Sequence, residues 1–249
     1  MYTLRNLSDS FLKNITVKIP HGLISLIGPN GSGKSTLLNV LSGLKDYSGS
    51  AVLHGREVRE ISSPRKKFAS LVSFVMSSKN FRPSYPFSVR EIIAMSRLPY
   101  RGLFSSLTKN DNEIIERSAE ILGISQLLER NILALSDGER QMAFIACGLA
   151  QDTQVILLDE PTSSLDPDKS AKVFEILRNF SDNGKCIIAA VHDINVSMFF
   201  SDYYIALKNG SLISHGRKLN ASVLSELYGT EFLQYHNDER NDSMWRALP

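Results

Sequence analysis

The chain has 249 residues, of which 43% are hydrophobic and 22% are charged, and its formal net charge is +2. This length suits one domain with a sizeable core, and the near-neutral balance argues against a nucleic-acid-binding protein, which usually concentrates basic charge. Because no apolar run approaches the roughly 20 residues that span a bilayer, any association with a membrane is expected to occur through a partner.

The first predicted unit is a strand, a glycine-rich turn and a helix. Leu23–Ile27 is a short, nearly continuous apolar run and indicates a buried strand. Turn residues follow at 28–32, and a helix is predicted over residues 34–43, with leucines at helical spacing. Residues 28–35 match the pattern G-x-x-x-x-G-K-[ST], which is typical of a loop that binds phosphates.

The residue types of this loop explain how it would bind phosphates. Glycines let backbone N–H groups point at phosphate oxygens, and the following helix adds its positive end. Lys34 is expected to reach the β- and γ-phosphates of a nucleoside triphosphate, and the Ser35 hydroxyl is expected to bind Mg²⁺. The alternative is a glycine-rich turn with an unrelated lysine, which would not require the flanking strand and helix. The sequence therefore predicts binding, and hydrolysis, of a triphosphate.

Two more buried strands end in polar residues. Residues 155–158 run into Asp159 and Glu160, and residues 186–191 run into His192. Buried apolar strands that alternate with helices indicate a largely parallel α/β sheet, whose ligands bind beyond the carboxyl ends of the strands. The glycine loop, the acidic pair and the histidine are therefore expected to converge on one site.

Each of these polar residues also has a structural interpretation. Asp159 is expected to hold Mg²⁺, but taken alone it could cap a helix beside Pro161. Glu160 is placed to polarise an attacking water as a general base, or it is an acid in the first turn of a helix. His192 is expected to orient the γ-phosphate or the water, although a lone histidine at a strand end is more often structural. The phosphate loop favours the chemical interpretation of all three.

A helix start between these strands indicates a second anion-binding position. Within residues 135–141, Ser136 and Glu139 form the S-x-x-E pattern of a capping box, so a helix is predicted from here through Ala150. A helix N-terminus favours an anion such as a γ-phosphate. Taken alone, the segment would be interpreted as a capped helix and nothing more.

These segments together resemble the nucleotide-binding subunits of ABC transporters, over nearly the whole chain and in the family's order. Residues 28–36 resemble the Walker A motif, residues 155–160 the Walker B motif with its catalytic glutamate, and residues 163–166 the D-loop. His192 is similar to the family's switch histidine. Residues 135–141 are similar to the family signature, Leu-Ser-Gly-Gly followed by Gln or Glu. The resemblance implies an α/β P-loop NTPase (an ABC ATPase) with a mostly parallel sheet core, an antiparallel β subdomain and a helical signature subdomain.

The resemblance also implies a mechanism that two chains share. Two such domains dimerise head to tail, and each ATP lies between the Walker A loop of one subunit and the signature of the other. Catalysis is then expected from Lys34, Glu160 and His192, and Mg²⁺ binding from Ser35, Asp159 and Ser77. The residues implied to bind ATP are Gly28, Pro29, Asn30, Gly31, Ser32, Gly33, Lys34, Ser35 and Thr36, with Phe11 on the adenine and with Ser136 and Gly138 on the partner's nucleotide.

The chain departs from the family pattern at two positions. Asp137 replaces the first signature glycine, so its carboxylate would lie near the partner's γ-phosphate unless it turns outward and favours its own helix N-terminus. We therefore expect weaker ATP-driven dimerisation than a glycine would allow. No glutamine follows the strand at 71–75, where the family's Q-loop glutamine contacts Mg²⁺ and the water; Ser77 stands there and could act through a water. Phe11 is alternatively a core residue.

Segments outside the site are similar to the subgroup that serves iron–siderophore, haem and cobalamin importers. These segments are residues 85–97, 103–108 and 223–229. The resemblance implies an importer ATPase that lies peripherally on the cytoplasmic face of the membrane, bound to two permease subunits and, indirectly, to a periplasmic or extracellular binding protein. We expect a single ABC ATPase domain over residues 1–235, with a helical subdomain at about 81–150, and a polar C-terminal tail at 236–249.

Three other interpretations are compatible with the sequence. The same enzyme could serve an exporter, or it could be a soluble ABC ATPase of iron–sulfur assembly or translation. It could also be a nucleotide-binding module with weak hydrolysis, if Asp137 and Ser77 have degraded the site. Retention of Lys34, Asp159, Glu160 and His192 argues against this last interpretation. The transported compound is not encoded here, because selectivity would lie in the other subunits.

Overall fold

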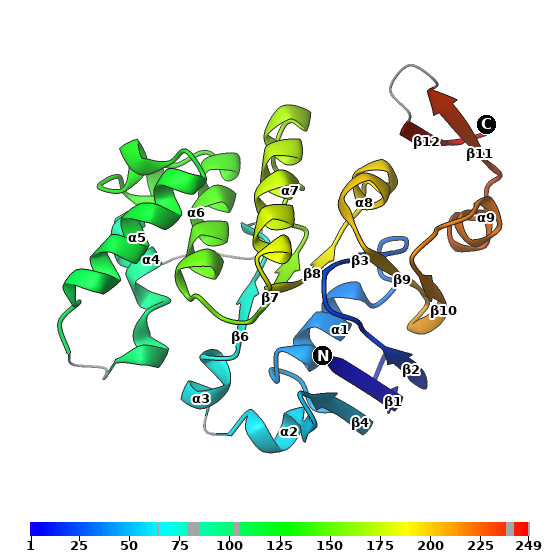
Figure 1. Cartoon of the computed structure of the whole chain (residues 1–249), viewed down its shortest axis with the longest axis horizontal. Coiled ribbons are helices and arrows are strands. Elements are labelled where there is room, and N and C mark those ends of the chain that lie inside the picture. The colour runs from blue at the N-terminus through cyan, green and yellow to red at the C-terminus, as the bar shows by residue number, and fades with distance from the viewer. Residues whose placement is uncertain (64, 79–84, 102–104, 238–241, 249) are drawn as a thin grey trace.

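A six-stranded sheet forms the centre of the computed structural model, which describes residues 1–63, 65–78, 85–101, 105–237 and 242–248 (Figure 1). From one edge to the other, its strands are β10 (Ser211–Gly216), β9 (Tyr203–Lys208), β3 (Leu23–Ile27), β8 (Cys186–Ala190), β7 (Val155–Asp159) and β6 (Val72–Val75). Neighbouring strands from β9 to β6 are parallel, and β10 pairs antiparallel with β9. The predicted, mostly parallel sheet core is confirmed.

The inner strands of this sheet are buried on both faces. Every residue of β3, β7 and β8 is buried, which is the pattern of parallel strands covered by helices on each side. Because successive side chains point to opposite faces of a strand, Ile24 and Leu26 pack on one side of β3 and Leu23 and Ile27 pack on the other. The open place left for a ligand is the carboxyl ends of the strands.

The helix α1 (Lys34–Leu41) packs in one core with the central sheet and a second, antiparallel sheet. Leu37 and Leu41 are fully buried in this shared core, and the Tyr2 hydroxyl donates a hydrogen bond of 2.7 Å to the Leu41 carbonyl oxygen. The predicted antiparallel subdomain is confirmed, and it fixes the helix that follows the phosphate loop. Its strand order is β2 (Ile15–Lys18), β1 (Tyr2–Ser8), β4 (Ser48–Leu53) and β5 (Arg56–Glu57).

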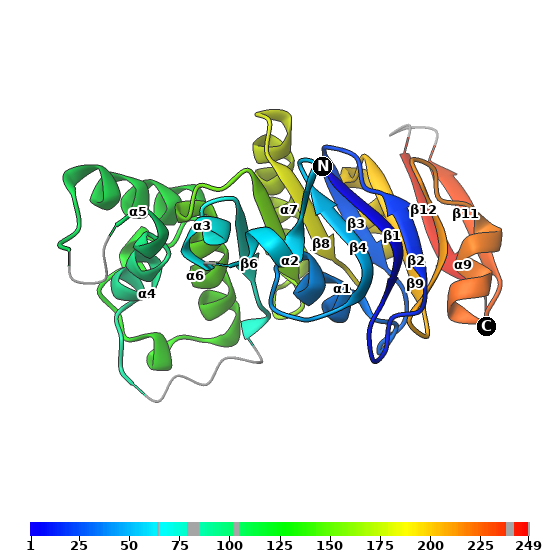
Figure 2. The same ribbon diagram turned by 90° about the horizontal axis from the view of Figure 1, so that it is seen from below.

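A helical subdomain lies at the opposite end of the molecule from the C-terminus (Figure 1, Figure 2). It contains α4 (Val89–Met95), α5 (Lys109–Ile121) and α6 (Asp137–Ala150), and α7 (Pro167–Asp182) packs in the same core. The first three helices begin with capping boxes, which satisfy N–H groups that a helix start leaves free. The paired residues are Ser88 with Glu91, Thr108 with Asp111, and Ser136 with Glu139. Residues 81–84 and 102–104, which belong to the expected subdomain, lie outside the described residues.

A buried ion pair fastens the three subdomain helices together. Arg97 is 5% exposed and donates through Nε to Asp111 Oδ1 at 2.9 Å and through Nη1 to the Ala150 carbonyl oxygen at 2.7 Å. Hydrogen bonds from Thr108 and Arg97 lower the pKa of Asp111 to about 2. One guanidinium therefore joins the segment after α4, the start of α5 and the end of α6.

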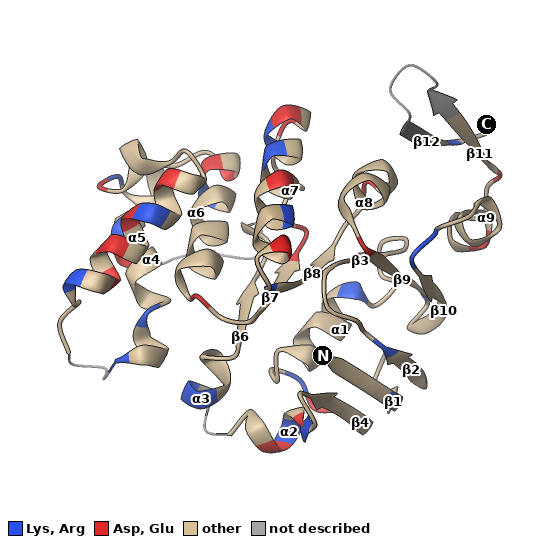
Figure 3. Cartoon of the chain, in the orientation of Figure 1, with Lys and Arg blue, Asp and Glu red and all other residues tan. Residues whose placement is uncertain are grey.

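Lys and Arg alternate with Asp and Glu along α5 and α7 (Figure 3), as expected for helix faces in contact with solvent. Within the described ranges, no helix combines the length and the apolar character needed to cross a membrane.

The remaining elements are short. In chain order they are α2 (Val58–Ile61), α3 (Arg65–Ala69), η2 (Leu98–Tyr100), η3 (Ser125–Leu127), η4 (Ile132–Ala134), α8 (Ile194–Phe200), α9 (Ala221–Tyr228), β11 (Phe232–Asn237) and β12 (Asp242–Ala247).

The C-terminal segment forms a hairpin, which corrects the expectation of a polar tail over residues 236–249. Strands β11 and β12 pair antiparallel. Trp245 is 6% exposed and packs with Leu224 and Phe232. Its backbone N–H donates to Asn195 Oδ1 at 2.7 Å, and Asn195 Nδ2 donates back to its carbonyl oxygen at 3.3 Å. The polar composition of the segment concealed this, because one tryptophan and one distant asparagine hold the hairpin in place.

Candidate active site

The turn between β3 and α1 requires glycine at two positions. Gly28 has a φ of 147°, and a Cβ there would lie 2.1 Å from the Leu207 carbonyl oxygen. Gly33 has a φ of 108°, and its Cβ would lie 2.9 Å from the Leu12 side chain. Other residues rarely adopt these backbone angles and would collide with these neighbours. The turn is therefore lined by backbone at the carboxyl end of β3, where parallel sheets bind ligands.

This turn borders a hollow of about 200 Å³ at the N-terminus of α1. Free backbone N–H groups at a helix start suit such a hollow to an anion. Phe11 lies at its edge and is 41% exposed. Gly28 and Pro29, which were also predicted to bind ATP, do not line the hollow; their carbonyl oxygens accept hydrogen bonds from Lys34. The lining residues are Phe11, Asn30, Gly31, Ser32, Gly33, Lys34, Ser35, Thr36 and Glu160.

The side chain of Lys34 folds back onto the loop. Its Nζ donates to the carbonyl oxygens of Gly28 at 2.8 Å and Pro29 at 3.2 Å, and the residue is 5% exposed. Burial lowers the pKa of Lys34, and the carboxylates of Glu160 and Asp159 oppose this shift. The ammonium group is thus held inside the loop by backbone carbonyls, which anionic oxygens could replace.

Ser35 and Asp159 form a pair of oxygen donors beside the hollow. The Ser35 hydroxyl donates to Asp159 Oδ1 at 2.9 Å, which joins the start of α1 to the end of β7. Asp159 is 7% exposed, and burial raises its pKa. No cluster of three or more His, Cys, Asp or Glu side chains that could hold a metal occurs in the described part of the chain. Two protein oxygens fit Mg²⁺ nonetheless, because this ion usually keeps waters and substrate phosphates as its other ligands.

Glu160 and His192 meet at the ends of adjacent strands. His192 Nε2 lies 2.6 Å from Glu160 Oε1. Glu160 adopts a φ of 50°, which is uncommon for a residue other than glycine and occurs often at functional sites. Its carboxylate lines the phosphate-loop hollow and also a neighbouring hollow of about 300 Å³ that includes His192. The structure thus brings both predicted residues together beside the phosphate loop.

The signature residues lie elsewhere in the chain. Ser136 caps α6 and Gly138 is in its first turn, and neither lines the phosphate-loop hollow. A Cβ at Gly138 would lie 3.2 Å from the Ser164 carbonyl oxygen, so the start of α6 contacts the segment predicted to be the D-loop. One chain by itself therefore does not bring the phosphate loop and the signature to one hollow.

The first departure from the family pattern forms an ion pair. Asp137 is the first residue of α6, and 72% of its side chain is exposed. Its Oδ1 accepts a hydrogen bond of 3.0 Å from Arg140 Nη1, one turn further along the helix. The opposite charge of Arg140, three positions after Asp137 in a predicted helix, is a signal for this pair in the sequence itself.

The second departure, Ser77, is buried away from the hollow. It is 3% exposed, and its hydroxyl has no hydrogen-bond partner among the described residues. The next residue connects this loop to the signature helix, because the Ser78 N–H donates to Gln141 Oε1 at 2.7 Å. Gln141 is fully buried, and a polar amide on the apolar side of α6 is a signal in the sequence for such a contact. Ser77 as a Mg²⁺ ligand stays a prediction.

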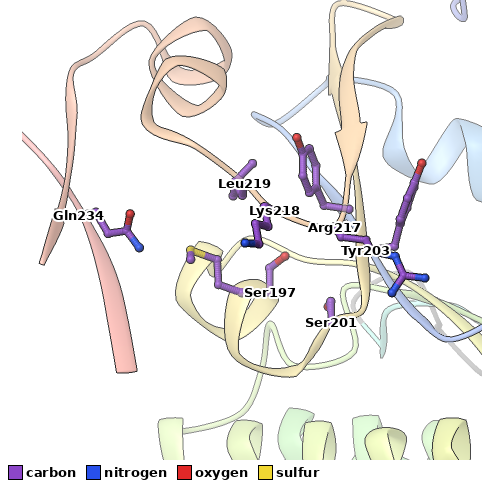
Figure 4. A pocket seen from close by; sticks show the side chains of 9 residues that line it. Ser197, Ser201, Tyr203, Arg217, Lys218, Leu219 and Gln234 are labelled. Carbon is purple, nitrogen blue, oxygen red and sulfur yellow. The ribbon is translucent and has the colours of Figure 1, made fainter. Parts of the chain in front are cut away.

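A larger hollow of about 350 Å³ lies at the C-terminal end of the fold (Figure 4). Arg217 and Lys218 after β10, Gln234 of β11 and the end of α8 border it. The Tyr203 hydroxyl in its wall is hydrogen-bonded to His215 at 2.6 Å. None of the predicted site residues lines this hollow, so its size does not make it the active site.

Comparison with known sequences identifies similar proteins. A family model described as ABC transporter matches residues 12–163. An iron(3+)-hydroxamate import ATP-binding protein of Bacillus subtilis is 35% identical over 84% of this chain and 77% of its own length. A petrobactin import ATP-binding protein of the same organism is 34% identical over 92% of both chains. A cobalamin import ATP-binding protein of Halobacterium salinarum is 32% identical over 78% of this chain and 48% of its own length.

Solved structures share the fold. A chain in an inward-facing structure of a metal-chelate type ABC transporter has a TM-score of 0.85 and 22% identity, covering 100% of this chain and 97% of that one. A dimeric ATP-binding cassette bound to ADP and phosphate has a TM-score of 0.79 and 24% identity, covering 88% of this chain and 100% of that one. At these identities the likeness concerns the fold alone.

Proposed function

Because this chain belongs to the ABC transporter family and is the ATPase subunit of an importer, we propose that it powers uptake of an iron–siderophore, haem or cobalamin-type compound. The relatives named above support this class, since their names refer to the import of iron(3+)-hydroxamate, petrobactin and cobalamin. The exporter and the soluble ATPase do not share this support.

One observation carries the assignment to the site: Lys34, Ser35 and Glu160 line a single hollow at the end of β3. In the proposed complex, ATP phosphates lie against the backbone N–H groups of the loop, and they replace the two carbonyl oxygens that now hold Lys34. The ammonium group then neutralises charge on the β- and γ-phosphates. Phe11, at the edge of the hollow, stacks on the adenine ring.

Ser35 and Asp159 are the residues that we propose as ligands of Mg²⁺. They already share a hydrogen bond of 2.9 Å, and a cation beside the buried Asp159 would favour its ionised form. When bound, the ion polarises the phosphoryl oxygens and neutralises developing charge. Ser77 does not border the hollow and could contribute only through a water.

We propose that Glu160 activates the attacking water and that His192 positions the glutamate. The contact of 2.6 Å between His192 and Glu160 supports this division of roles, because a hydrogen bond from the imidazole would restrict the carboxylate to one orientation. General bases of this kind accelerate proton transfer by about 10² to 10⁴.

The second half of each site is proposed to come from a second copy of the chain. Similar cassettes have been solved as dimers, and the signature of this chain does not reach its own hollow. In a head-to-tail dimer, Ser136 and Gly138 at the start of α6 would contact the partner's γ-phosphate, which the helix N-terminus favours. ATP would then join the two subunits.

The proposed assembly has two permease subunits in the membrane and this chain on its cytoplasmic face. A periplasmic or extracellular binding protein would deliver the transported compound to the permeases, and no nucleic acid takes part. Residues 1–235 are proposed as one ATPase domain, with the helical subdomain inside about 81–150.

Uptake in cells tests this function. A strain that lacks the gene would be supplied with the chain or with its Glu160→Gln variant, and accumulation of radiolabelled iron–siderophore, haem and cobalamin would be measured. We expect the chain, but not the variant, to restore uptake of one of these compounds. Uptake of all three that does not depend on the gene would contradict the proposed substrate class.

A further inference from the structure

Arg140 lies beside the carboxylate of Asp137, the residue that replaces the first signature glycine. Its side chain is 19% exposed, and its Nη2 donates to the Leu135 carbonyl oxygen at 3.0 Å. Its Nη1 donates to Asp137 at 3.0 Å, and its buried Nε has no hydrogen-bond partner in the described part of the chain. The guanidinium is therefore anchored to the backbone before α6 and presents one edge to the carboxylate.

The carboxylate of Asp137 lies in a favourable place for an anion. It is the first residue of α6, whose positive end attracts negative charge. In the proposed dimer, a phosphate of the partner's ATP approaches the same helix start. Because two anions cannot share this position without strong repulsion, the carboxylate has to be held aside and neutralised before the phosphate binds.

We propose that Arg140 is a positioning residue that holds the Asp137 carboxylate aside, so that the signature can accept the partner's ATP despite lacking its first glycine. The inference rests on the proposed function of the shared site. The ion pair accounts for the tolerance of Asp137 at this position: the anchored cation offsets the added charge. Neither residue lines the phosphate-loop hollow of its own chain.

The alternative role for Arg140 is direct contact with the phosphate. An arginine is well suited to bind phosphate, and only one of its three nitrogens contacts Asp137. The two roles differ in one measurable respect. If Arg140 only holds Asp137 aside, neutralising Asp137 makes Arg140 dispensable, whereas a direct ligand is needed whatever residue stands at 137.

A double-mutant cycle separates these roles. In the full chain carrying Glu160→Gln, the ATP concentration that gives half-maximal dimer is measured by analytical ultracentrifugation. Arg140→Gln is expected to raise this concentration about tenfold or more, since it leaves Asp137 unpaired near the phosphate. Adding Asp137→Asn to Arg140→Gln is expected to bring it back to within about threefold of the parent. Asp137→Asn alone is expected to change it by less than about threefold, because Arg140 already neutralises the charge.

Salt provides a readout that a structural defect would not give. Raising the ionic strength from about 0.05 to about 0.5 M screens exposed charges, so it should partly restore dimerisation of Arg140→Gln relative to the parent. Arg130→Gln is the matched control, since Arg130 lies 3.9 Å from Glu139 of the same helix start and does not pair with Asp137. We expect it to behave like the parent. Affinity for ADP should be equal in every variant, because the phosphate loop is untouched.

Three results would overturn the inference. An Arg140→Gln variant that dimerises like the parent would show that the pair has no role. A double variant as impaired as Arg140→Gln would assign Arg140 to direct phosphate binding. A large gain from Asp137→Asn alone, on the order of tenfold, would show that Arg140 does not neutralise the carboxylate. By contrast, a parent that binds ATP without ever dimerising would contradict the proposed shared site itself.

Discussion

The two halves of the proposed ATP site differ in how their polar groups are satisfied. In the phosphate-loop half, the side chains bond within the chain: Lys34 to loop carbonyls, Ser35 to Asp159, and His192 to Glu160. The Ser32 hydroxyl is the exception in the described part of that loop, since it is buried without a partner. Around the signature helix, the Gln141 amide nitrogen and the hydroxyl of Ser77 in the adjoining loop are buried and have no partner among the described residues.

This difference indicates in which half of the site most polar groups have hydrogen-bond partners within one chain. Groups that already bond to one another can exchange those bonds for ligand bonds at little net cost, so the phosphate-loop half is ready to bind. Each buried group without a partner costs about 1–3 kcal/mol, so the signature half gains from any rearrangement that supplies one. A new partner for the Gln141 amide nitrogen or the Ser77 hydroxyl would therefore stabilise the packing around the signature helix.

The largest expected effect breaks the phosphate-loop half. Glu160→Gln is expected to reduce Mg²⁺-dependent ATP hydrolysis by about 10² to 10⁴, because the amide cannot accept the proton of the attacking water. Binding of ATP, measured by isothermal titration calorimetry, should persist. Glu175→Gln, on the exposed face of α7, is the matched control and should hydrolyse ATP like the wild type. Equal rates in the wild type and in Glu160→Gln would remove Glu160 from the mechanism.

The next largest effect tests how far the buried Arg97–Asp111 ion pair stabilises the helical subdomain that carries the signature. Arg97→Ala is expected to destabilise the chain by about 3–5 kcal/mol, because it leaves Asp111 buried without its charge partner. Chemical denaturation followed by circular dichroism measures this change. Arg90→Ala, which breaks a solvent-exposed pair with Glu129, should cost less than about 1 kcal/mol. Similar losses for both variants would show that the buried pair has no special weight.

Acid should act on the same subdomain in a defined pH range. The pKa of Asp111 in the folded chain is about 2, below its ordinary value of about 3.9. The stabilisation is therefore complete above about pH 4 and is lost as the pH falls toward 2. Denaturation midpoints measured across this range should fall less steeply for Asp111→Asn than for the wild type. Parallel pH profiles would contradict the role of this carboxylate.

The smallest expected effect tests whether Phe11 belongs to the phosphate-loop half of the ATP site. Phe11→Ala is expected to weaken ATP binding about fivefold, close to 1 kcal/mol, through loss of stacking on adenine. Inorganic tripolyphosphate should bind both proteins equally, since it has no base. Phe199→Ala removes another exposed phenylalanine, on α8, and should leave ATP affinity unchanged. An equal loss for tripolyphosphate would mean that Phe11 supports the loop instead.

Local sequence patterns made much of the fold and of the phosphate-loop site predictable. The phosphate loop lies within one stretch of sequence, the capping box at Ser136 spans a single helical turn, and the strands before Glu160 and His192 are plain apolar runs. Each of these signals depends only on residues that are neighbours in the chain. Once the strands are taken to be parallel, their carboxyl ends lie at one edge of the sheet, so the segments are expected to meet there.

Contacts between distant segments were beyond such patterns. Arg97 reaches a carboxylate 14 positions away and a carbonyl 53 positions away, and nothing in its own neighbourhood indicates either partner. The hairpin at the C-terminus depends on Asn195, 50 positions before Trp245. Burial of Ser77 likewise occurs in a loop that contacts the signature helix through Ser78 and Gln141, 63 positions apart, which a sequence pattern does not encode.

The C-terminal hairpin gives the chain a built-in optical probe. Trp245 is the single tryptophan of the sequence, and its main chain is bonded on both sides to Asn195, three residues after His192. Intrinsic fluorescence excited at the indole therefore comes from one known position, beside the helix that follows the histidine. A shift in its emission on adding nucleotide would report movement of that helix directly, without any attached dye.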